Sequence, residues 1–587
     1  MPLLSTRIRH YFGLDLPKRE LALHFSLPII SSRFKGTSAG DDELIHKLEA
    51  AKEAPHEYFR LLLVEIKHIN RCQLKPQQRL SLTRQILKLY YPMALAQLTR
   101  LTRNGGVPEQ DERRLLLDML VEIAQIMMIS CQILYAGYYV SNNFRYARSR
   151  NVLYECASRI FEMLNLKQHA KSLRYQLLEG QDWLIANTIF HVMNCYENVT
   201  QPLPTLSRDS GTEGKAREVS LRQQYGLLQT VAKFDMLRWP THLQWVIASY
   251  FHSVSNALQL KIDEGNCKLG RNVFISYCYD SYPAHGSRLE SPQGKSLILD
   301  FNGLAEAIRK DCMGLFQAKK HNNPYLMPPR FARLPETEHF VISDQLVRGL
   351  ENVTDGTELE KEQKVADFRI FVGFPEVFNL LHHQQGRFGA EDRLADVLAK
   401  RSALIAEDHD ATEKSIWSLL FQNEKMLRLS TQETEFTTPM SIGSLLAYGL
   451  GEDINRPSFA VVSRIFRPSH KRVIIDLQRI ASYAEPVLIG VTTSAEPAKP
   501  ALLMYDLQRL GGWGLLFPPR DILPGIDKLT LSRNRSTMEV ELINMRNATT
   551  DFYLFSTSLT SEQLGIVGQP DYPVPPVKKT HAAGWII

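Results

Sequence analysis

The chain has 587 residues, of which 44% are hydrophobic and 22% are charged, so it is too long for one core and has the composition of a soluble globular protein. The net charge of +6 is small for this length, and lysine and arginine are spread along the chain, which argues against a nucleic-acid-binding protein. The seven cysteines lie far apart without a CxxC pair, which argues against a disulfide framework and favours a reducing compartment. Met1 to Pro28 carries charges throughout and lacks the apolar core of a signal peptide, so we expect a cytoplasmic protein.

Helical periodicity dominates the first half of the chain, after an irregular segment over 1–40. Tyr58, Leu62 and Ile69 recur at helical spacing, and Pro76 stands where the next helix begins. These signals predict a helical domain over 41–262, in which the Pro-, Ser- and Gly-containing stretch at about 201–215 is a surface loop or linker. The further helices are expected at about 110–140, 143–165, 168–197, 217–233 and 240–260.

One apolar stretch has two interpretations. Ile123 to Val140 holds no charged residue and approaches the length of a membrane span. It also contains Gln125, Ser130 and Gln132, and a buried helix at the centre of a helical domain gives the same pattern. We favour the buried helix and expect no membrane span.

Short β-like runs appear in the middle of the chain. Strands are expected at 272–279, 296–299 and 367–373, with a helix at 304–316. The region over 268–400 is therefore predicted to be mixed α/β. The charged stretch that follows predicts a connecting helix over 401–421.

The last part of the chain alternates short apolar runs with turn residues, which is typical of one or two small antiparallel barrels. We divide it into a β-barrel over 422–495, a second small β region over 496–560 and a Pro-rich tail over 561–587. Polar and apolar residues alternate over 472–478, so this strand is expected to have one solvated and one buried face. The strands are expected at 444–449, 459–466, 472–477, 486–491, 501–505, 515–517, 528–531, 538–543 and 552–555. The predicted fold class is α+β and multidomain: a helical N-terminal domain, a mixed middle region and an antiparallel β-barrel C-terminal region.

Several segments together resemble a known family. They are Ile69-Asn-Arg71, Tyr225-Gly-Leu-Leu228, 367–374 (DFRIFVGF), Ile442-Gly-Ser-Leu-Leu-Ala447 and 459–466 (FAVVSRIF). In this order they are similar to large bacterial proteins that join a helical N-terminal half to a PilZ-like C-terminal barrel. Members of that family are described as receptors for cyclic di-GMP or as relatives of such receptors. The resemblance implies a degenerate PilZ-like barrel, with cyclic di-GMP as the candidate ligand and no other cofactor.

The family binds its dinucleotide with two sequence elements. An RxxxR segment before the first strand holds phosphates and stacks on guanine, and a [D/N]xSxxG segment on the barrel adds guanine contacts with a glycine that allows close approach. Where the first element is expected, the chain has Lys361 and Lys364 and no arginine pair. Where the second is expected, it has Glu433 and Glu435, which would repel phosphates, and no glycine in register. The two lysines are candidate substitutes for the arginines.

A basic cluster is predicted within one hairpin. Arg464, Arg467 and Arg472 lie close in sequence, with Arg479 further along the second strand. They form either an anion-binding surface or a solvated face of the barrel, and strand alternation favours the second. The glycine-rich segment over 509–514 does not follow the strand-loop-helix order of a phosphate cradle, so we interpret it as a β-turn.

The candidate ligand-binding residues are therefore Lys361, Lys364, Arg464, Arg467 and Arg472, and no catalytic or metal-ligating residue is predicted. Since no complete catalytic motif is present, we expect a non-catalytic bacterial regulatory protein that signals to a protein partner, with cyclic di-GMP as its candidate ligand.

Two other functions are considered. A ligand-independent adaptor or scaffold would keep the fold and use the barrel for protein contacts. A hydrolase would need an unrecognised site near Asp280, His285, His382 and His383, for which the sequence offers no motif.

Overall fold

The structure is a computed structural model that describes residues 27–31, 41–102, 105–140, 147–194, 199–208, 216–265, 267–290, 295–351, 368–385, 417–434, 437–450, 457–469, 471–491, 498–519, 528–533 and 536–566. Lys361, Lys364, most of the segment over 1–40, the connecting helix predicted before residue 417 and the tail from 567 lie outside the described residues.

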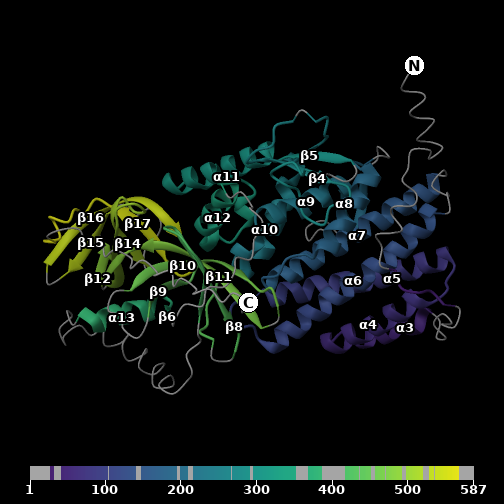
Figure 1. The fold of residues 1–587 in the computed structure, drawn as a ribbon, viewed down its shortest axis with the longest axis horizontal. Helices are drawn as coiled ribbons and strands as arrows, with labels where there is room; N and C mark the ends of the chain where they lie inside the picture. Colours follow the sequence, from purple (N-terminus) through teal and green to yellow (C-terminus); the bar gives the residue numbers. More distant parts are fainter. Residues whose placement is uncertain are drawn as a thin grey trace, which may run out of the picture. The chain divides into compact units, whose positions relative to one another are not determined.

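The chain divides into two compact units (Figure 1). The first unit contains the helices of the N-terminal half, and the second contains a sheet and a barrel. This confirms the α+β fold class with a helical N-terminal half. The first unit comprises Met1–Gly105, Glu109–Ala318 and Asn323–Thr357, and the second comprises Gly106–Pro108, Lys319–Asn322 and Glu358–Ile587.

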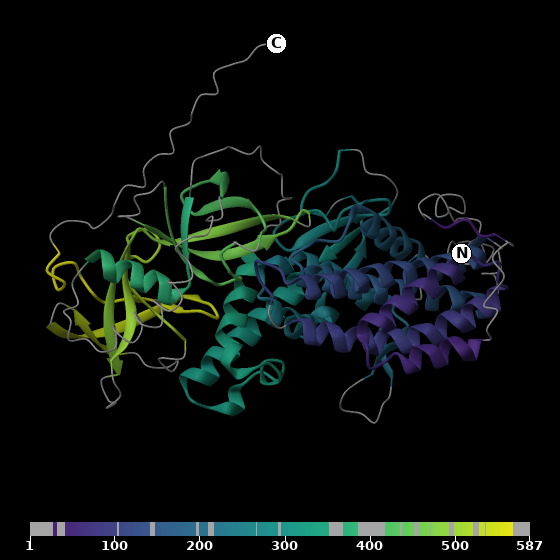
Figure 2. The ribbon, with the colours of Figure 1, turned by 90° about the horizontal axis from the view of Figure 1, so that it is seen from below.

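Long helices form the N-terminal part of the first unit and run alongside one another (Figure 2). Pro55 and Pro76 occupy the first positions of α4 and α5, where a missing backbone N–H costs nothing. The central helix α6 packs against α4, α5 and α7. The helices are α3 (Asp41–Ala50), α4 (Pro55–Arg71), α5 (Pro76–Leu101), α6 (Asp111–Val140), α7 (Ala147–Leu173) and α8 (Gly180–Asn194).

Helix α6 contains the apolar stretch that has two interpretations. Among the described residues it is the helix whose length and composition would allow a membrane span, and 61% of its most apolar window is buried inside the protein. Its polar residues serve helix packing, because Ser130 donates to Asn70 Oδ1 at 2.6 Å and Asn70 donates to the Ile126 carbonyl at 3.0 Å. This is the packing of a core helix, and the lack of a membrane span stays a prediction.

Buried ion pairs connect the helices of the first unit. The Lys167 ammonium on α7 donates to Asp182 Oδ1 on α8 at 2.8 Å and to Gln125 Oε1 on α6 at 2.7 Å. Arg174 pairs with Glu109 at 3.1 Å, and both side chains are buried. Because an ion that loses its partner in the interior is strongly destabilising, these pairs restrict how α6, α7 and α8 can pack.

The rest of the first unit is mixed α and β, as predicted for the region after residue 268. The surface loop predicted at about 201–215 is wrong over 202–208, where β1 pairs with β2 as an antiparallel hairpin. A three-stranded sheet has the order β3-β5-β4. The elements are β1 (Pro202–Arg208), β2 (Ala216–Ser220), α9 (Leu221–Lys233), η2 (Met236–Arg238), α10 (Thr241–Val254), η3 (Ser255–Ala257), β3 (Gln259–Ile262), β4 (Val273–Tyr277), β5 (Ser296–Asp300), α11 (Asn302–Lys320), η4 (Pro324–Leu326), η5 (Phe331–Arg333), η6 (Glu336–Glu338) and α12 (His339–Glu351).

An open six-stranded sheet with the order β6-β9-β10-β11-β8-β7 forms one part of the second unit. Strand β7 corrects the prediction of a connecting helix, because 418–422 is extended and pairs with β8. The helix α13 follows β6 directly. The elements are β6 (Phe368–Val372), α13 (Phe374–Gln385), β7 (Ser418–Gln422), β8 (Met426–Gln432), β9 (Leu445–Leu450), β10 (Ser458–Phe466) and β11 (Arg472–Ala481).

A closed antiparallel barrel forms the other part, in the order β12-β13-β14-β17-β16-β15. The barrel predicted over 422–495 is therefore wrong in position, because strands β7 to β11 belong to the open sheet. The boundary at 495 is wrong as well, since β12 pairs with both β13 and β15. The strands are β12 (Tyr483–Val491), β13 (Lys499–Asp506), β14 (Gly512–Phe517), β15 (Lys528–Arg533), β16 (Ser536–Ala548) and β17 (Tyr553–Thr557).

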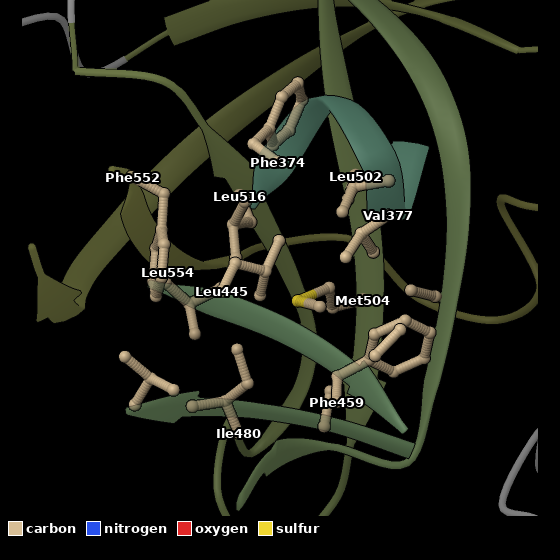
Figure 3. Packing of buried hydrophobic residues seen from close by; sticks show 14 of the residues in the cluster. Phe374, Val377, Leu445, Phe459, Ile480, Leu502, Met504, Leu516, Phe552 and Leu554 are labelled. Atoms are coloured by element: carbon tan, nitrogen blue, oxygen red, sulfur yellow. The ribbon is translucent and has the colours of Figure 1, made fainter. Parts of the chain in front are cut away.

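The sheet, α13 and the barrel of the second unit share one apolar core (Figure 3). Phe374 and Val377 of α13 point into it together with Leu445 and Phe459 of the sheet. The barrel contributes buried residues from β12, β13, β14 and β17. They are Ala484, Leu502, Met504, Leu516 and Leu554.

The strand β11 is buried on both faces, which corrects the prediction of one solvated face. Ile474 and Asp476, on the face expected to be wet, are each 3% exposed. Asp476 receives two hydrogen bonds from Arg428 of β8, at 2.7 and 3.1 Å. A carboxylate that is paired in this way can be buried without water.

We expect Leu516→Ala to destabilise the second unit by about 2–5 kcal/mol, because truncation leaves a cavity in the core that the sheet and the barrel share. Leu516 is fully buried, whereas Ile543 of the same barrel is 56% exposed. Ile543→Ala is therefore the control and should change the free energy of unfolding by less than about 1 kcal/mol. Urea unfolding of the full chain measures both, and equal losses would contradict the shared core.

Candidate anion-binding site

Arg467 is neutralised inside the second unit. It is 2% exposed, and its Nε and Nη2 each donate to the Glu433 carboxylate at 2.9 Å. Nη2 also donates to the Gly106 carbonyl at 2.7 Å, within the same unit. Glu433, which the sequence marks as a repulsive group for phosphates, is thus the partner of a predicted phosphate-binding arginine.

Arg464 and Arg472 lie at other positions of the open sheet. Arg464 is 5% exposed, and its guanidinium lies over the Phe466 ring at 5.5 Å. Arg472 donates from Nε to Ser430 Oγ at 3.2 Å. The alternative of a solvated arginine face is wrong for Arg464 and Arg467, because both are buried. A ligand-binding role for these residues stays a prediction.

Arg479, near the C-terminal end of β11, has a different environment. The residue is 8% exposed, and its backbone N–H donates to the Lys425 carbonyl in the β7–β8 turn at 2.9 Å. Its Nε and Nη2 atoms are buried and have no hydrogen-bond partner of good geometry among the described residues. Two buried guanidinium nitrogens without an acceptor have lost hydration and gained little in return, so they are suited to hold an anion.

The β13–β14 turn brings a second guanidinium to the same place. Asp506 Oδ1 accepts from the backbone N–H groups of Gln508 and Arg509, at 3.0 and 2.8 Å, and Asp506 Oδ2 accepts from Arg509 Nη1. Arg509 Nη2 donates to the Glu424 carbonyl, next to the carbonyl that Arg479 contacts. The Arg479 backbone and the Arg509 guanidinium therefore meet at the β7–β8 turn, and both arginines act on the pKa of Tyr448.

Two glycines allow the backbone to pass close to this site. Gly511 and Gly512 have φ values of +77° and +134°, which residues with a side chain rarely adopt. A Cβ on Gly511 would lie 3.9 Å from Nη2 of Arg546, an exposed residue of β16. Because Gly511 has no side chain, its backbone stays accessible to a ligand beside Arg546, the third arginine near the site.

Tyr448 of β9 completes the site. Burial raises the pKa of its phenol, while Arg479 and Arg509 oppose that rise. The phenol is therefore neutral at pH 7 and able to donate a hydrogen bond. Together Arg479, Arg509, Tyr448 and the Asp506–Gly512 turn form what we name the Arg479 site.

Two segments beside the closed barrel can be compared with the spacings that the resemblance implies, and in the first of them only one of the two positions is an arginine. The first strand of the barrel is β12, and Arg479 and Tyr483 occupy the two arginine positions of an RxxxR spacing that ends where β12 begins. The β13–β14 turn reads Asp506-Leu-Gln-Arg-Leu-Gly511, which matches [D/N]xSxxG apart from glutamine in place of serine. The comparison requires the start of the barrel, which the structure gives and the sequence alone does not.

The residues considered for a hydrolase are placed in both units. Asp280 and His285 of the first unit form a hydrogen bond through Oδ2 and Nε2. His382 and His383 lie on α13 of the second unit. Among the described residues there is no group of three or more His, Cys, Asp or Glu side chains that could hold a metal ion.

A buried polar network anchors the segment that carries Asp280. His191 Nε2 lies 3.3 Å from Ser276 Oγ, which lies 2.7 Å from the Tyr225 hydroxyl. Tyr225 donates to Asn187 Oδ1 at 2.8 Å, and Asn187 Nδ2 donates to the Asp280 carbonyl at 2.9 Å. Burial, with a smaller effect of Lys295, lowers the pKa of His191 to about 3. The histidine is therefore a neutral structural residue.

No protein-family model, no curated protein and no solved structure matches this chain significantly. The comparisons therefore give no support to the PilZ resemblance, and the geometry of the Arg479 site has to carry any functional argument.

We expect Arg479→Met to leave the stability unchanged or to raise the free energy of unfolding by about 1–3 kcal/mol, because it removes a buried guanidinium of which two nitrogens lack acceptors. The matched variant Arg428→Met leaves the buried Asp476 carboxylate unpaired and should cost about 3–5 kcal/mol. Urea unfolding compares the two. A large loss of stability in Arg479→Met would show that this guanidinium holds the fold together.

We expect the stability to fall as the pH decreases from about 6.5 to about 3, because His191 stays neutral in the folded chain and binds a proton in the unfolded chain. The unfolded state then holds more protons, so this residue contributes a slope of at most about 1.4 kcal/mol per pH unit. His191→Gln should reduce the slope of unfolding free energy against pH. An identical slope in the variant would contradict a neutral buried histidine.

Proposed function

We propose that this chain is a non-catalytic regulatory protein whose second unit binds a phosphate-bearing ligand at the Arg479 site. The observation that carries this proposal is the buried Arg479 guanidinium, with two nitrogens that have no acceptor among the described residues. By contrast, the buried Arg467 pairs with Glu433, and the half-buried Arg428 pairs with Asp476. Arg479 is thus the guanidinium that an incoming anion would compensate.

We propose cyclic di-GMP as the ligand. Its phosphodiesters suit the planar guanidinium fork of Arg479, and its guanines suit stacking on the planar guanidinium of Arg509. The Asp506–Gly511 turn follows the [D/N]xSxxG pattern with one change, which supports the same ligand class. Gln508 can donate and accept hydrogen bonds, as the serine of the pattern does.

The position of the site supports a regulatory role. It gathers the end of β11, the β7–β8 turn and the β13–β14 turn, so a ligand would join the sheet to the barrel within the second unit. A bound anion would add hydrogen bonds that the free protein lacks and would shift the population toward the state that makes them. We propose that a protein partner in the bacterial cytoplasm senses this change.

The test is calorimetric titration of the full chain with cyclic di-GMP, with GTP as control ligand. We expect saturable binding of cyclic di-GMP and a loss of at least tenfold in affinity for Arg479→Met, because a charge-assisted hydrogen bond contributes about 1.5–3 kcal/mol. Arg472→Met is the matched control, since Arg472 lies at the other end of β11. It should bind as the unmodified protein does.

Two results would redirect the proposal. Equal losses for Arg479→Met and Arg472→Met would move the site to the basic residues predicted from the sequence. A lack of binding in the unmodified chain, with no change in its thermal unfolding, would favour the ligand-independent adaptor.

A further inference from the structure

One face of α11 exposes apolar side chains between basic ones. Met313 and Phe316 are 64% and 61% exposed, which is unusual for large apolar residues of a globular protein. Arg309 is exposed and lies four residues before Met313, and Lys320 is exposed and lies four residues after Phe316. At these helical spacings the four residues form one stripe along the helix. The stripe combines apolar residues at its centre with cations at both ends.

The turn after α11 exposes two more apolar residues in a fixed conformation. Asn322 has φ of +46°, and its N–H and that of Asn323 donate to carbonyls of the last helical turn at 3.3 and 2.9 Å. The Asn323 side chain then accepts from the Tyr325 N–H at 3.0 Å. Tyr325 is 94% exposed and Leu326 is 44% exposed. These side chains are held outward by a hydrogen-bonded turn.

A close approach at Gly314 brings the turn against the helix. A Cβ at this position would lie 2.7 Å from Pro328 Cγ and 3.6 Å from the Leu326 carbonyl. Leu326 therefore lies beside the segment that carries Met313 and Phe316. We name these four apolar residues, Met313, Phe316, Tyr325 and Leu326, the α11 patch.

The charges around the α11 patch are mainly positive. Lys310 and Arg333 are exposed in addition to the two cations of the stripe, and these four cations outnumber the exposed carboxylates Glu306 and Glu336 of the same region. Asp311 does not offset them at the surface, because it is buried and pairs with Arg330 at 3.0 Å. The patch therefore suits a partner surface that is anionic and that accepts apolar side chains.

We propose that the α11 patch docks the protein on the surface of an anionic lipid bilayer. Tyr325 and Phe316 are 94% and 61% exposed, and such prominent aromatic side chains suit insertion between lipid headgroups. Lysine and arginine at the edges of such a patch place their charges at the headgroups while their stems cover apolar surface. This docking is peripheral and does not depend on the ligand proposed for the second unit.

The experiment measures sedimentation of the full chain with vesicles of phosphatidylcholine, either alone or mixed with phosphatidylglycerol. We expect binding to the anionic vesicles that weakens as salt is added. The double variant Phe316→Ser with Tyr325→Ser should lower the partition coefficient at least tenfold. Arg309→Gln with Lys320→Gln should lower it by a similar factor, because each cation near the surface contributes about fivefold.

The matched control is Val64→Ser with Leu115→Ser, two residues of the first unit that are 59% and 55% exposed outside the patch. This variant should bind as the unmodified protein does. The proposal is overturned if the unmodified chain does not sediment with anionic vesicles, or if the control loses as much binding as the patch variants. The proposal is also overturned if the chain binds polyglutamate but not vesicles and the patch variants lose that binding. The partner of the patch would then be an acidic protein.

Discussion

The second unit depends on one apolar core that an open sheet and a closed barrel share. Neither part can bury its inner face alone, because Leu445 and Phe459 of the sheet pack with Leu502 and Leu516 of the barrel. The helix α13 adds Phe374 to the same core. This shared core holds the end of β11 and the two turns near enough for Arg479 and Arg509 to converge. The Arg479 site is thus a consequence of how the two parts are joined.

Buried charges distinguish the Arg479 site from the rest of the protein. In the first unit, the Lys167 ammonium is paired with Asp182 and also bonds to Gln125. In the barrel, Arg533 donates to Glu485. Such pairs stabilise a unique packing because either ion alone would be costly. Burial of the Arg479 guanidinium costs desolvation free energy, and no carboxylate among the described residues offsets it. Proteins tolerate such a destabilising residue mainly at binding sites.

Local sequence patterns predict most of the helices and strands, but they predict few of the pairings between strands that are far apart in sequence. The runs that became β9 to β17 have short apolar stretches between turn residues, and those signals are local. The closure of the barrel rests on the pairing of β12 with β15 and of β14 with β17, which local periodicity does not encode. For this reason the sequence predicts a barrel over 422–495, whereas the closed barrel begins at β12.

The candidate site shows the same limit. The arginines of the predicted hairpin were recognised as a cluster, but Glu433 was not recognised as the partner of Arg467, because the two are far apart in sequence. Arg479 was noted only as a member of that cluster, and the glycine-rich segment after Arg509 was interpreted as an ordinary turn. Their meaning depends on burial and on the neighbouring β7–β8 turn, which only the folded chain provides.

The measurement that tests the central claim most directly is amide hydrogen exchange of the full chain with and without cyclic di-GMP. Binding at the Arg479 site should slow exchange over Asn423–Lys425 and over Asp506–Gly512, because a ligand held by Arg479 and Arg509 would restrict both turns. The first half of β16 (536–541), at the opposite end of that strand from Arg546, should keep its exchange rate. Slowed exchange at Arg464 and Arg472 with unchanged turns, or no change anywhere at saturating ligand, would contradict the account.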